Sequence, residues 1–354
     1  MNRRRARPSA LLAAALLLLI AAGCTRIQRT DEAERVPDQG PAAELRLGYF
    51  PNVTHAAALI GTGKDLFTNR LGKTKLTPVQ FNAGPDEVGA LLGGSLDAGF
   101  IGSGPAINAF SKSEGSAVRM IAGATSRGAQ LVVRPEIRTP DQLRGKTIAT
   151  PQVGNTQDVS AKKWLATKGL TGKVNITSMQ NSQTLNAFRS GEVQAAWLPE
   201  PWSSRLVLDA GAKVLLDESS LWPGGQFPTT VLVVRTEFLH AHPETVRALL
   251  RGELDAIDYA ERDPAGAKAE VNAQLKKLTG KSLSGKVIDR AWADITVSAD
   301  PLCSRFPALA RDQQTAGITA RSPEVSGMAD LRALNEVRAQ VHQPTISSAG
   351  LDKK

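Results

Sequence analysis

The sequence is poor in the residues from which enzymes build metal centres and covalent intermediates. Its 354 residues include only 2 cysteines and 4 histidines. The one close histidine pair, His240 and His242, directly precedes Pro243 and Glu244, which indicate the start of a helix rather than a set of metal ligands. Neither a Gly-x-Ser-x-Gly elbow nor a Walker-type glycine loop occurs. We therefore expect no catalytic residue, no metal and no cofactor, with an enzyme as the first alternative to a binding protein.

Charge of one sign and interleaved aromatic residues are also scarce. The formal net charge is +9, but Arg3, Arg4, Arg5 and Arg7 supply four of these charges at the very start, which leaves about +5 for the rest of the chain. Basic and aromatic residues do not alternate in any segment, which argues against a nucleic-acid partner. The 42% of hydrophobic residues is enough for the cores of two domains of ordinary size.

Long hydrophobic runs are limited to one, at residues 10–22, which is shorter than the roughly 20 residues that span a bilayer. It follows a basic start and precedes Gly23 and Cys24, which is the pattern of a signal peptide. IAAGC at 20–24 resembles the lipobox of bacterial lipoproteins, in which cleavage precedes a cysteine that carries a diacylglycerol. We expect a signal peptide at 1–23, lipidation of Cys24 and a place on the extracytoplasmic face of the cell membrane; a single transmembrane anchor is the alternative.

Two polar segments flank the rest of the chain. Residues 24–43 are rich in Pro, Gly, Asp and Glu and are expected to form a flexible tether, and residues 344–354 a similar C-terminal tail. If Cys24 is lipidated, Cys303 has no partner, and we expect it to be a buried thiol without chemistry.

From residue 44 onward, short β-like runs alternate with helical ones. Strands are expected at 45–50, 76–81, 98–101, 118–122 and 130–133, and again at 146–150, 174–178, 195–198, 213–216 and 230–234. Helices are expected at 56–67, 86–92, 105–111, 156–168, 182–188 and 201–208, and over most of 237–342. Strands separated by helices predict a parallel α/β fold.

The order of these elements recurs within the chain. GSLDAGFI at 94–101 aligns with GEVQAAWL at 191–198, and FPNV at 50–53 aligns with TPQV at 150–153. Two matches at nearly the same offset predict two α/β lobes of one design, with chance similarity between strands as the alternative. We assign lobe 1 to residues 44–132 and 231–343 and lobe 2 to residues 133–230, joined by two crossing strands.

Two such lobes predict a central cleft that binds a small anion. Ligands of open parallel sheets lie outside the carboxyl ends of the strands, where the following helices present unsatisfied N–H groups with partial positive charge. A solute that contacts both lobes favours the closed arrangement, because only that arrangement makes both sets of contacts.

Two strand-to-helix junctions of lobe 1 carry candidate solute contacts. In the first, Asn52 and His55 are polar residues at a helix start, although helix capping by Thr54 is the simpler interpretation. In the second, Ser103 has a hydroxyl and Gly104 allows close approach of the backbone. An ordinary glycine-rich turn is the alternative there.

Two junctions of lobe 2 correspond to these. Gly154, Asn155 and Thr156 precede a helix and predict a nest of N–H groups, with capping as the alternative. In WLPEPW at 197–202, Trp202 can form an apolar wall, and Glu200 aligns with Ser103. A carboxylate repels an anion, so Glu200 is expected either to bind a donor on the solute or to form a salt bridge between the lobes.

Three further candidates lie beside the predicted crossing strands. Arg127 is, by its position alone, a candidate counter-ion for an anionic head group, and solvation of its side chain at the surface is the alternative. Gln130 and Thr229 lie at the two expected crossings and are added as solute contacts.

The order of these segments resembles the aliphatic sulfonate, nitrate and taurine group of periplasmic-binding-protein-like ABC transporter subunits. The resemblance covers about 44–338 and rests on LGYFPN at 47–52, FIGSGPA at 100–106, GNTQD at 154–158 and WLPEPW at 197–202. It implies a type II periplasmic-binding-protein fold, in which the C-terminal helices pack on the first lobe. It also implies that Ser103, Gly104, Gly154, Asn155, Thr156 and Glu200 take solute-contact positions.

The same resemblance implies a function and partners. The chain is expected to be the solute-binding subunit of an ABC importer, a monomer that delivers an aliphatic sulfonate to a membrane permease driven by a separate ATPase. Nitrate, taurine and a thiamine-pyrimidine precursor are alternative solutes. A sensory lipoprotein of the same fold that takes no part in transport is a further alternative.

Overall fold

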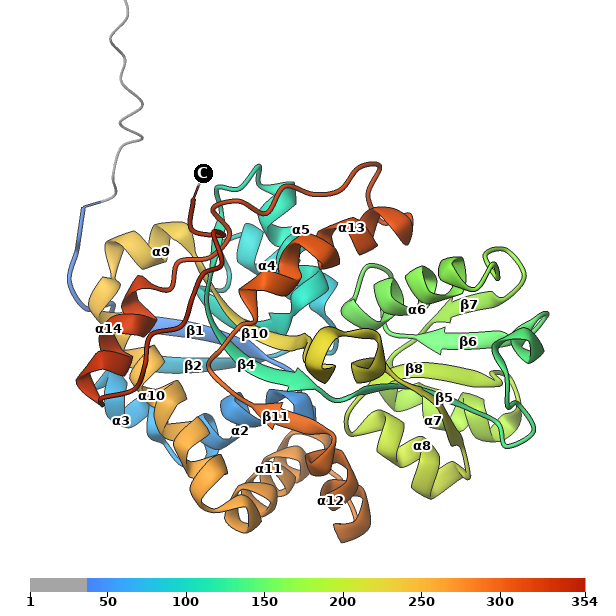
Figure 1. The fold of residues 1–354 in the computed structure, drawn as a ribbon. Helices are drawn as coiled ribbons and strands as arrows, with labels where there is room; N and C mark the ends of the chain where they lie inside the picture. Colours follow the sequence, from blue (N-terminus) through green and yellow to red (C-terminus); the bar gives the residue numbers. More distant parts are fainter. Residues whose placement is uncertain (1–36, 354) are drawn as a thin grey trace, which may run out of the picture. The chain divides into compact units, whose positions relative to one another are not determined.

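The computed structural model describes residues 37–353, and residues 38–353 belong to one compact unit. The expected signal peptide, Cys24 and most of the expected tether lie outside the described residues. Two separate mixed sheets with helices around them make up the compact unit, as Figure 1 shows.

The sheet of lobe 1 has six strands in the order β11-β4-β10-β3-β1-β2. β1, β2 and β3 are parallel to one another, and β4 and β10 run antiparallel to their neighbours. The strands are β1 (Glu44–Tyr49), β2 (Lys75–Gln80), β3 (Ala98–Gly102), β4 (Val118–Arg127), β10 (Pro228–Arg235) and β11 (Ile295–Val297).

The sheet of lobe 2, β7-β6-β8-β5-β9, has the order of the lobe 1 sheet read from its other end, β2-β1-β3-β10-β4, without a counterpart of β11. Again the first three strands are parallel and the last two are antiparallel to their neighbours. They are β5 (Ala129–Val133), β6 (Thr147–Thr150), β7 (Asn175–Ser178), β8 (Ala195–Pro199) and β9 (Lys213–Asp217). The expected internal repeat is therefore a repeat of topology.

Helices follow the parallel strands in both lobes, and a second group follows β10. Lobe 1 has α2 (Ala56–Gly63), α3 (Leu66–Leu71), α4 (Gly84–Leu92) and α5 (Ser103–Lys112), and lobe 2 has α6 (Thr156–Thr167), α7 (Asn181–Ser190) and α8 (Trp202–Ala210). The C-terminal group is α9 (Thr236–Ala241), α10 (Pro243–Arg262), α11 (Pro264–Thr279), α12 (Gly285–Ala293), α13 (Phe306–Thr315) and α14 (Arg332–Gln340). Short 3-10 turns are η1 (Val53–His55), η2 (Pro140–Leu143), η3 (Glu218–Leu221), η4 (Pro223–Gly225) and η5 (Cys303–Arg305).

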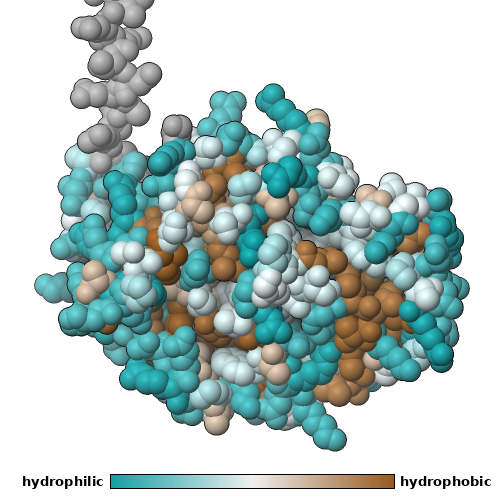
Figure 2. Space-filling model, viewed as in Figure 1, coloured by the Kyte–Doolittle hydropathy of each residue, from teal (hydrophilic) through white to brown (hydrophobic). Residues whose placement is uncertain are grey.

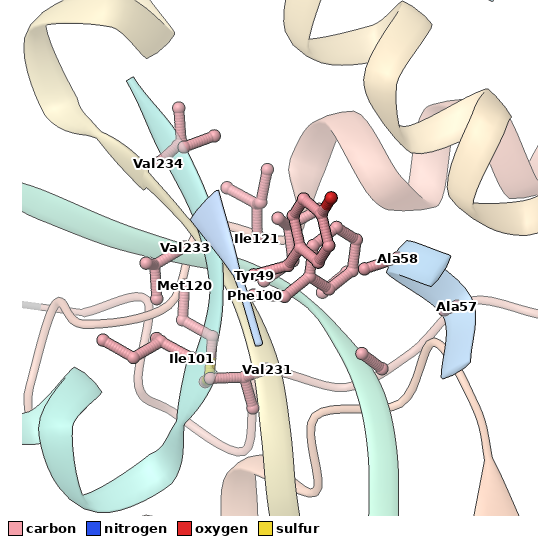
Figure 3. Close-up of a cluster of buried hydrophobic side chains, with 14 of the residues drawn as sticks. Tyr49, Ala57, Ala58, Phe100, Ile101, Met120, Ile121, Val231, Val233 and Val234 are labelled. Atoms are coloured by element: carbon pink, nitrogen blue, oxygen red, sulfur yellow. The ribbon is translucent and has the colours of Figure 1, made fainter. Parts of the chain in front are cut away.

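The main hydrophobic core fills lobe 1. Figure 3 shows part of it, where Phe100 and Ile101 of β3 lie among Met120, Ile121 and Val231 from the neighbouring strands. These central strands are buried on both faces, so they are apolar without alternation, which is the pattern of a covered sheet. Lobe 2 has two smaller clusters, one on each face of its sheet.

The chain crosses between the lobes slightly earlier than the sequence indicates. Only Gly128 separates β4 from β5, with a positive φ of 74° beside the φ of 65° of Arg127. β5 therefore starts lobe 2 at Ala129, and β10 returns to lobe 1 at Pro228. The two residues in left-handed geometry turn the chain sharply enough for β4 and β5 to belong to different sheets.

Both ends of the described chain pack more closely than their composition predicts. The N–H of Ala42 donates to Thr245 Oγ1 at 2.9 Å, so the tether is held before residue 44. In the expected tail, Leu351 is buried, and its carbonyl accepts from the N–H of Ala329 at 3.1 Å. One apolar side chain and a few backbone bonds are enough to fix a short polar segment, which composition does not reveal.

Within the described residues, no helix is long and apolar enough to cross a membrane. Cys303 is a buried free thiol, as expected, and burial raises its pKa to about 12.

On the face drawn in Figure 2, hydrophobic side chains gather over lobe 2. That lobe also carries Leu208 and Val214, which are 44% and 40% exposed near its edge strand β9.

Candidate functional site

A small chamber lies between the lobes, at the ends of their strands. We call it the inner chamber, and its volume is about 20 Å³, the space of one or two water molecules. Its lining comes from the carboxyl ends of parallel strands in both lobes and from the start of β10. The lining residues are Phe50, Asn52, Thr54, His55, Asn82, Gly102, Asn155, Thr156, Gln157, Asn181, Pro199, Thr229 and Thr230.

The inner chamber is polar but carries no charged side chain among its lining residues. Its one titratable group is His55, which is 2% exposed. Burial lowers the pKa of His55 to about 3, and its Nδ1 accepts from the N–H of Phe50 at 3.3 Å. The imidazole is therefore neutral at physiological pH. An anion bound here would be held by neutral donors.

Helix N-termini supply those donors. α5, α6 and α7 begin at the chamber, directly after Gly102, Asn155 and Gln180. The first N–H groups of a helix have no partner within the helix and carry partial positive charge, which attracts anions. Asn155 Oδ1 accepts from the N–H of Thr156 at 3.0 Å. Asn181 is 9% exposed, and its buried Oδ1 has no hydrogen-bond partner within the described residues.

The lobes touch beside the chamber. The N–H of Gly104 donates to Thr156 Oγ1 at 3.2 Å, and Asn108 Nδ2 donates to the carbonyl of Gly154 at 3.3 Å. A Cβ atom placed on Gly102 would lie 2.4 Å from Thr156 Oγ1. Glycine at position 102 therefore allows the lobes to approach this closely.

A larger outer chamber of about 470 Å³ adjoins the inner one. Both chambers are lined by Asn52, Asn82 and Asn181, which form the neck between them. Its walls combine apolar and charged side chains from α8 and from the α11–α12 region, namely Trp202, Arg205, Asp209, Leu275, Leu278, Lys281, Leu283 and Val287. Trp202 Nε1 donates to Asn52 Oδ1 at 2.7 Å, which links the two lobes at the neck.

The structure brings most of the expected contact residues together. Asn52, His55, Asn155, Thr156 and Thr229 line the inner chamber, and Trp202 lines the outer one. Gly104 and Gly154 take part in the contact between the lobes beside the chamber. Ser103 is buried, and its Oγ has no hydrogen-bond partner within the described residues. Contact of any of these residues with a solute stays a prediction.

Three other candidates lie away from both chambers. Glu200 is fully buried, with Ser203 Oγ donating to Oε1 at 2.6 Å and the N–H of Ser204 to Oε2 at 3.2 Å. Arg290 of α12 completes an ion pair with Oε1 at 3.2 Å. Burial raises the pKa of Glu200 to about 7, although the serine hydrogen bonds and Arg290 act to lower it. The salt bridge between the lobes that the sequence left open is thus what the structure shows.

Gln130 and Arg127 belong to the same hinge region. Gln130 Nε2 donates to Asp294 Oδ2 at 2.9 Å and to Asp217 Oδ2 at 3.1 Å, so its amide is already engaged. Arg127 lies at the crossing, where its backbone bonds to the chain before β10. Neither Arg127 nor Gln130 lines a chamber. The sequence placed them only by their position beside a strand, which does not show on which side of the sheet a side chain lies.

Sequence reasoning missed two members of the neck. Asn82 follows β2 and Asn181 opens α7 after β7, so they occupy corresponding places in the two lobes. Both satisfy the rule that led to Asn52 and Asn155, a polar residue at the carboxyl end of a parallel strand. Arg290 was also missed, because nothing near it in the sequence points to lobe 2. Among the described residues, no group of three His, Cys, Asp or Glu side chains could hold a metal ion.

Comparison with known proteins gives the family of the chain. Residues 38–275 match the model of the NMT1-like family. The chain is 31% identical over 207 residues to the taurine-binding periplasmic protein of Escherichia coli (strain K12), a match that covers 57% of this chain and 63% of that protein.

Solved structures give the fold. The alkanesulfonate-binding protein SsuA from Xanthomonas axonopodis pv. citri, bound to MOPS, is similar with a TM-score of 0.66 and 25% identity, covering 80% of this chain and 95% of that one. The periplasmic nitrate-binding protein NrtA from Synechocystis PCC 6803 has a TM-score of 0.71 at 15% identity, covering 86% and 90%. The two lobes thus have the fold of the periplasmic binding proteins, and the chain belongs to the NMT1-like family.

Proposed function

We propose that this protein is the solute-binding subunit of an ABC importer and that it captures a small organic sulfonate by closure of its lobes. The observation that carries the proposal is the uncharged inner chamber, onto which three helix N-termini from both lobes open. Neutral N–H and hydroxyl donors suit the three oxygens of a sulfonate, which spread one negative charge. The taurine-binding and alkanesulfonate-binding relatives support the same class of solute.

The outer chamber favours an organic sulfonate over a bare anion such as nitrate. The inner chamber must widen to admit a sulfonate head group, because it now has the space of one or two water molecules. A head group there would have its substituent at the asparagine neck, directed into about 470 Å³ of space. Trp202, Leu278 and Leu283 offer apolar surface to that substituent. Nitrate has no substituent and would leave this surface in contact with water, so it would gain nothing from it.

Taurine is the second candidate, for a specific reason. Its ammonium group needs an acceptor close to the sulfonate, and the unpartnered Oδ1 of Asn181 lies at the neck. A neutral amide oxygen accepts a hydrogen bond but does not neutralise the charge. We therefore expect taurine to bind more weakly than an alkanesulfonate of the same length.

We also propose that the protein is a monomer, that it is attached to the membrane through lipid on Cys24, and that it delivers its solute to a membrane permease with its ATPase. The names of the relatives support an extracytoplasmic binding protein. The lipobox at 20–24 supports the anchor. Globomycin, which blocks lipoprotein processing, is expected to leave the precursor uncut in cells, whereas an unmodified mature Cys24 found by mass spectrometry would remove the anchor from the proposal.

Isothermal titration with methanesulfonate, ethanesulfonate, butanesulfonate, taurine and nitrate tests the solute. We expect the alkanesulfonates to bind, with affinity rising about twofold to fourfold for each added methylene group, since burial of one contributes about 0.8 kcal/mol at most. Nitrate is expected to bind weakest. Tighter binding of nitrate than of any sulfonate, or no binding of sulfonates at all, would contradict the proposal.

A further inference from the structure

Arg290 connects the lobes through three side chains at once. Its Nη1 donates to Ser204 Oγ at 2.7 Å and to Glu200 Oε1 at 3.2 Å, and its Nη2 donates to Gln130 Oε1 at 2.7 Å. Asp294, the residue directly after α12, lies 3.4 Å from the same guanidinium and accepts from Gln130. A planar guanidinium with several donors is suited to hold such a set in fixed positions.

The helix that carries Arg290 is joined to lobe 1 at both ends, although one of its faces packs against α8 of lobe 2. The chain leaves α12 directly into β11, which pairs antiparallel with β4 of the lobe 1 sheet from Ile295 to Val297. On its other side α12 follows α11, which packs on α2 of lobe 1. Ser204, Glu200 and Gln130 belong to the β8–α8 junction and β5 of lobe 2. The bonds of Arg290 therefore pass from one lobe to the other.

Loss of these bonds would be costly for lobe 2. The Glu200 side chain has no exposed surface, whereas the Arg290 side chain is 24% exposed. Lobe 2 satisfies Glu200 with two serine donors but supplies no cation, so a movement that separates α12 from lobe 2 would leave a buried carboxylate without its ion-pair partner or admit water to it. Removal of one member of a buried pair is much more destabilising than the pair is stabilising.

None of these groups touches the place where a solute would lie. Among the described residues that line the inner and outer chambers, Gln130, Glu200, Ser204 and Arg290 do not occur. A contact that holds the closed arrangement without touching the solute acts on the equilibrium between open and closed lobes. It then changes the affinity for every solute by the same factor.

The geometry points to Arg290 as a closure residue: by bonding from α12 to Glu200, Ser204 and Gln130 it stabilises the closed lobes and sets affinity without contributing to solute choice. It is a positioning residue, since it acts through the arrangement of the two lobes. The inference goes beyond the proposed function, because it holds for any solute that the cleft binds.

Small-angle X-ray scattering and titration of Arg290→Gln and Arg290→Lys test it. We expect Arg290→Gln to weaken binding of ethanesulfonate and butanesulfonate by the same factor, about tenfold or more, which is within the usual range of coupling between sites. The loss should lie in faster dissociation, with association little changed. The solute-free protein should show a larger radius of gyration. Arg290→Lys keeps the charge but cannot hold three acceptors, so an intermediate effect is expected.

Arg70→Gln is the matched control. Arg70 makes a two-bond ion pair with Asp255, at 2.6 and 2.9 Å, but both residues lie within lobe 1. This variant should change neither affinity nor radius of gyration.

Two results would overturn the inference. If Arg290→Gln and Arg290→Lys lower the melting temperature but leave both the affinities and the radius of gyration unchanged, Arg290 is only a structural tie. If they change the ratio of the two affinities, it takes part in solute choice. Scattering from the solute-free variants needs no ligand, so failure of the proposed function would leave this part of the test intact.

Discussion

The β3–α5 junction of lobe 1 and the β8–α8 junction of lobe 2 occupy corresponding places in two sheets of the same strand order, yet their residues do different things. At the first, Gly102 and the start of α5 face the inner chamber, and Gly104 contacts lobe 2. At the second, Glu200 turns its carboxylate away from the chamber toward Arg290. One junction lines the inner chamber and contacts the opposite lobe, whereas the carboxylate of the other bonds to Arg290.

The difference follows from side-chain chemistry at aligned positions. Without side chains, glycine lets backbone amides approach a ligand and the opposite lobe. A carboxylate in the same place would repel an anion, and here it is held by donors of its own helix and by a cation from lobe 1. A repeated fold thus provides two equivalent edges, and single residues decide which groups each edge presents to the chambers.

The largest effect is expected when a side chain is added at Gly102, in the β3–α5 junction of lobe 1. In Gly102→Val, the added atoms would meet Thr156 Oγ1, because a Cβ there lies only 2.4 Å from it. Overpacking of this kind costs about 1–3 kcal/mol, and it acts only on the closed lobes, so sulfonate affinity should fall by up to about a hundredfold. Titration measures the loss. Gly89→Ala, at a position with open space around it, is the control; equal losses in both would refute the steric account.

A smaller effect is expected at the neck. Asn181→Ala removes the unpartnered Oδ1 and the amide donor of a 9% exposed side chain. Loss of one hydrogen bond to a charged ligand costs about 1.5 kcal/mol, or roughly tenfold in affinity. Taurine should lose more than ethanesulfonate if its ammonium group binds there. The exposed Gln183→Ala on the same helix should have no effect on either titration.

Substitution of Glu200, in the β8–α8 junction of lobe 2, should alter the affinity for solutes but not the order of preference among them. Glu200→Gln keeps the shape and one acceptor for Arg290 but removes the charge, so affinities should shift a few-fold, corresponding to about 1 kcal/mol. Because Glu200 lies outside both chambers, the order of preference among alkanesulfonates, taurine and nitrate should stay the same. A changed order in the same titration series would place Glu200 among the solute contacts, as the sequence allowed.

The smallest effect is expected on the pH dependence of stability. It comes from Glu218, which accepts a hydrogen bond from Trp197 of β8. Burial raises the pKa of Glu218 to about 7, although Ser160 and Trp197 donate to it. An unfolded glutamate titrates near about 4.3, so the folded state keeps a proton that the unfolded chain releases. This stabilising contribution is complete below that value and is lost as pH rises toward about 7.

Glu218→Gln should remove this contribution and reduce the fall in unfolding free energy between about pH 4.5 and 7. Urea denaturation at several pH values measures it, with the exposed Glu136→Gln as control. Because Glu200, Glu87 and Glu253 also have pKa values raised by burial, part of the slope should remain. A slope as steep as that of the unaltered protein would contradict the assignment.

Local pattern was sufficient to predict every strand except β11 and most of the helices, because most of the β-like runs are short, rich in apolar residues and bounded by turn residues. The same reasoning found Asn155 and Thr156, since a polar residue after a parallel strand must lie at the cleft. Lobe boundaries were displaced by a few residues, because Arg127 and Gly128 turn the chain in a way that hydrophobicity does not record. β11 was missed, since three residues give no periodic signal.

The partners of Glu200 could not be predicted from sequence. Its two local donors lie within four residues, but Arg290 is ninety residues away along the chain. Nor could alignment show that the carboxylate of Glu200 faces away from the cleft while Gly102 faces it. Both facts depend on how the lobes close, which is a property of the whole fold.

A crystal structure of the protein with ethanesulfonate tests the central claim most directly. We expect the sulfonate oxygens in the inner chamber, within hydrogen-bond distance of N–H groups at the starts of α5 and α6. The ethyl group should lie at the neck, toward Trp202. A sulfonate bound elsewhere, or held in the cleft by an arginine or lysine side chain in place of those amides, would contradict it.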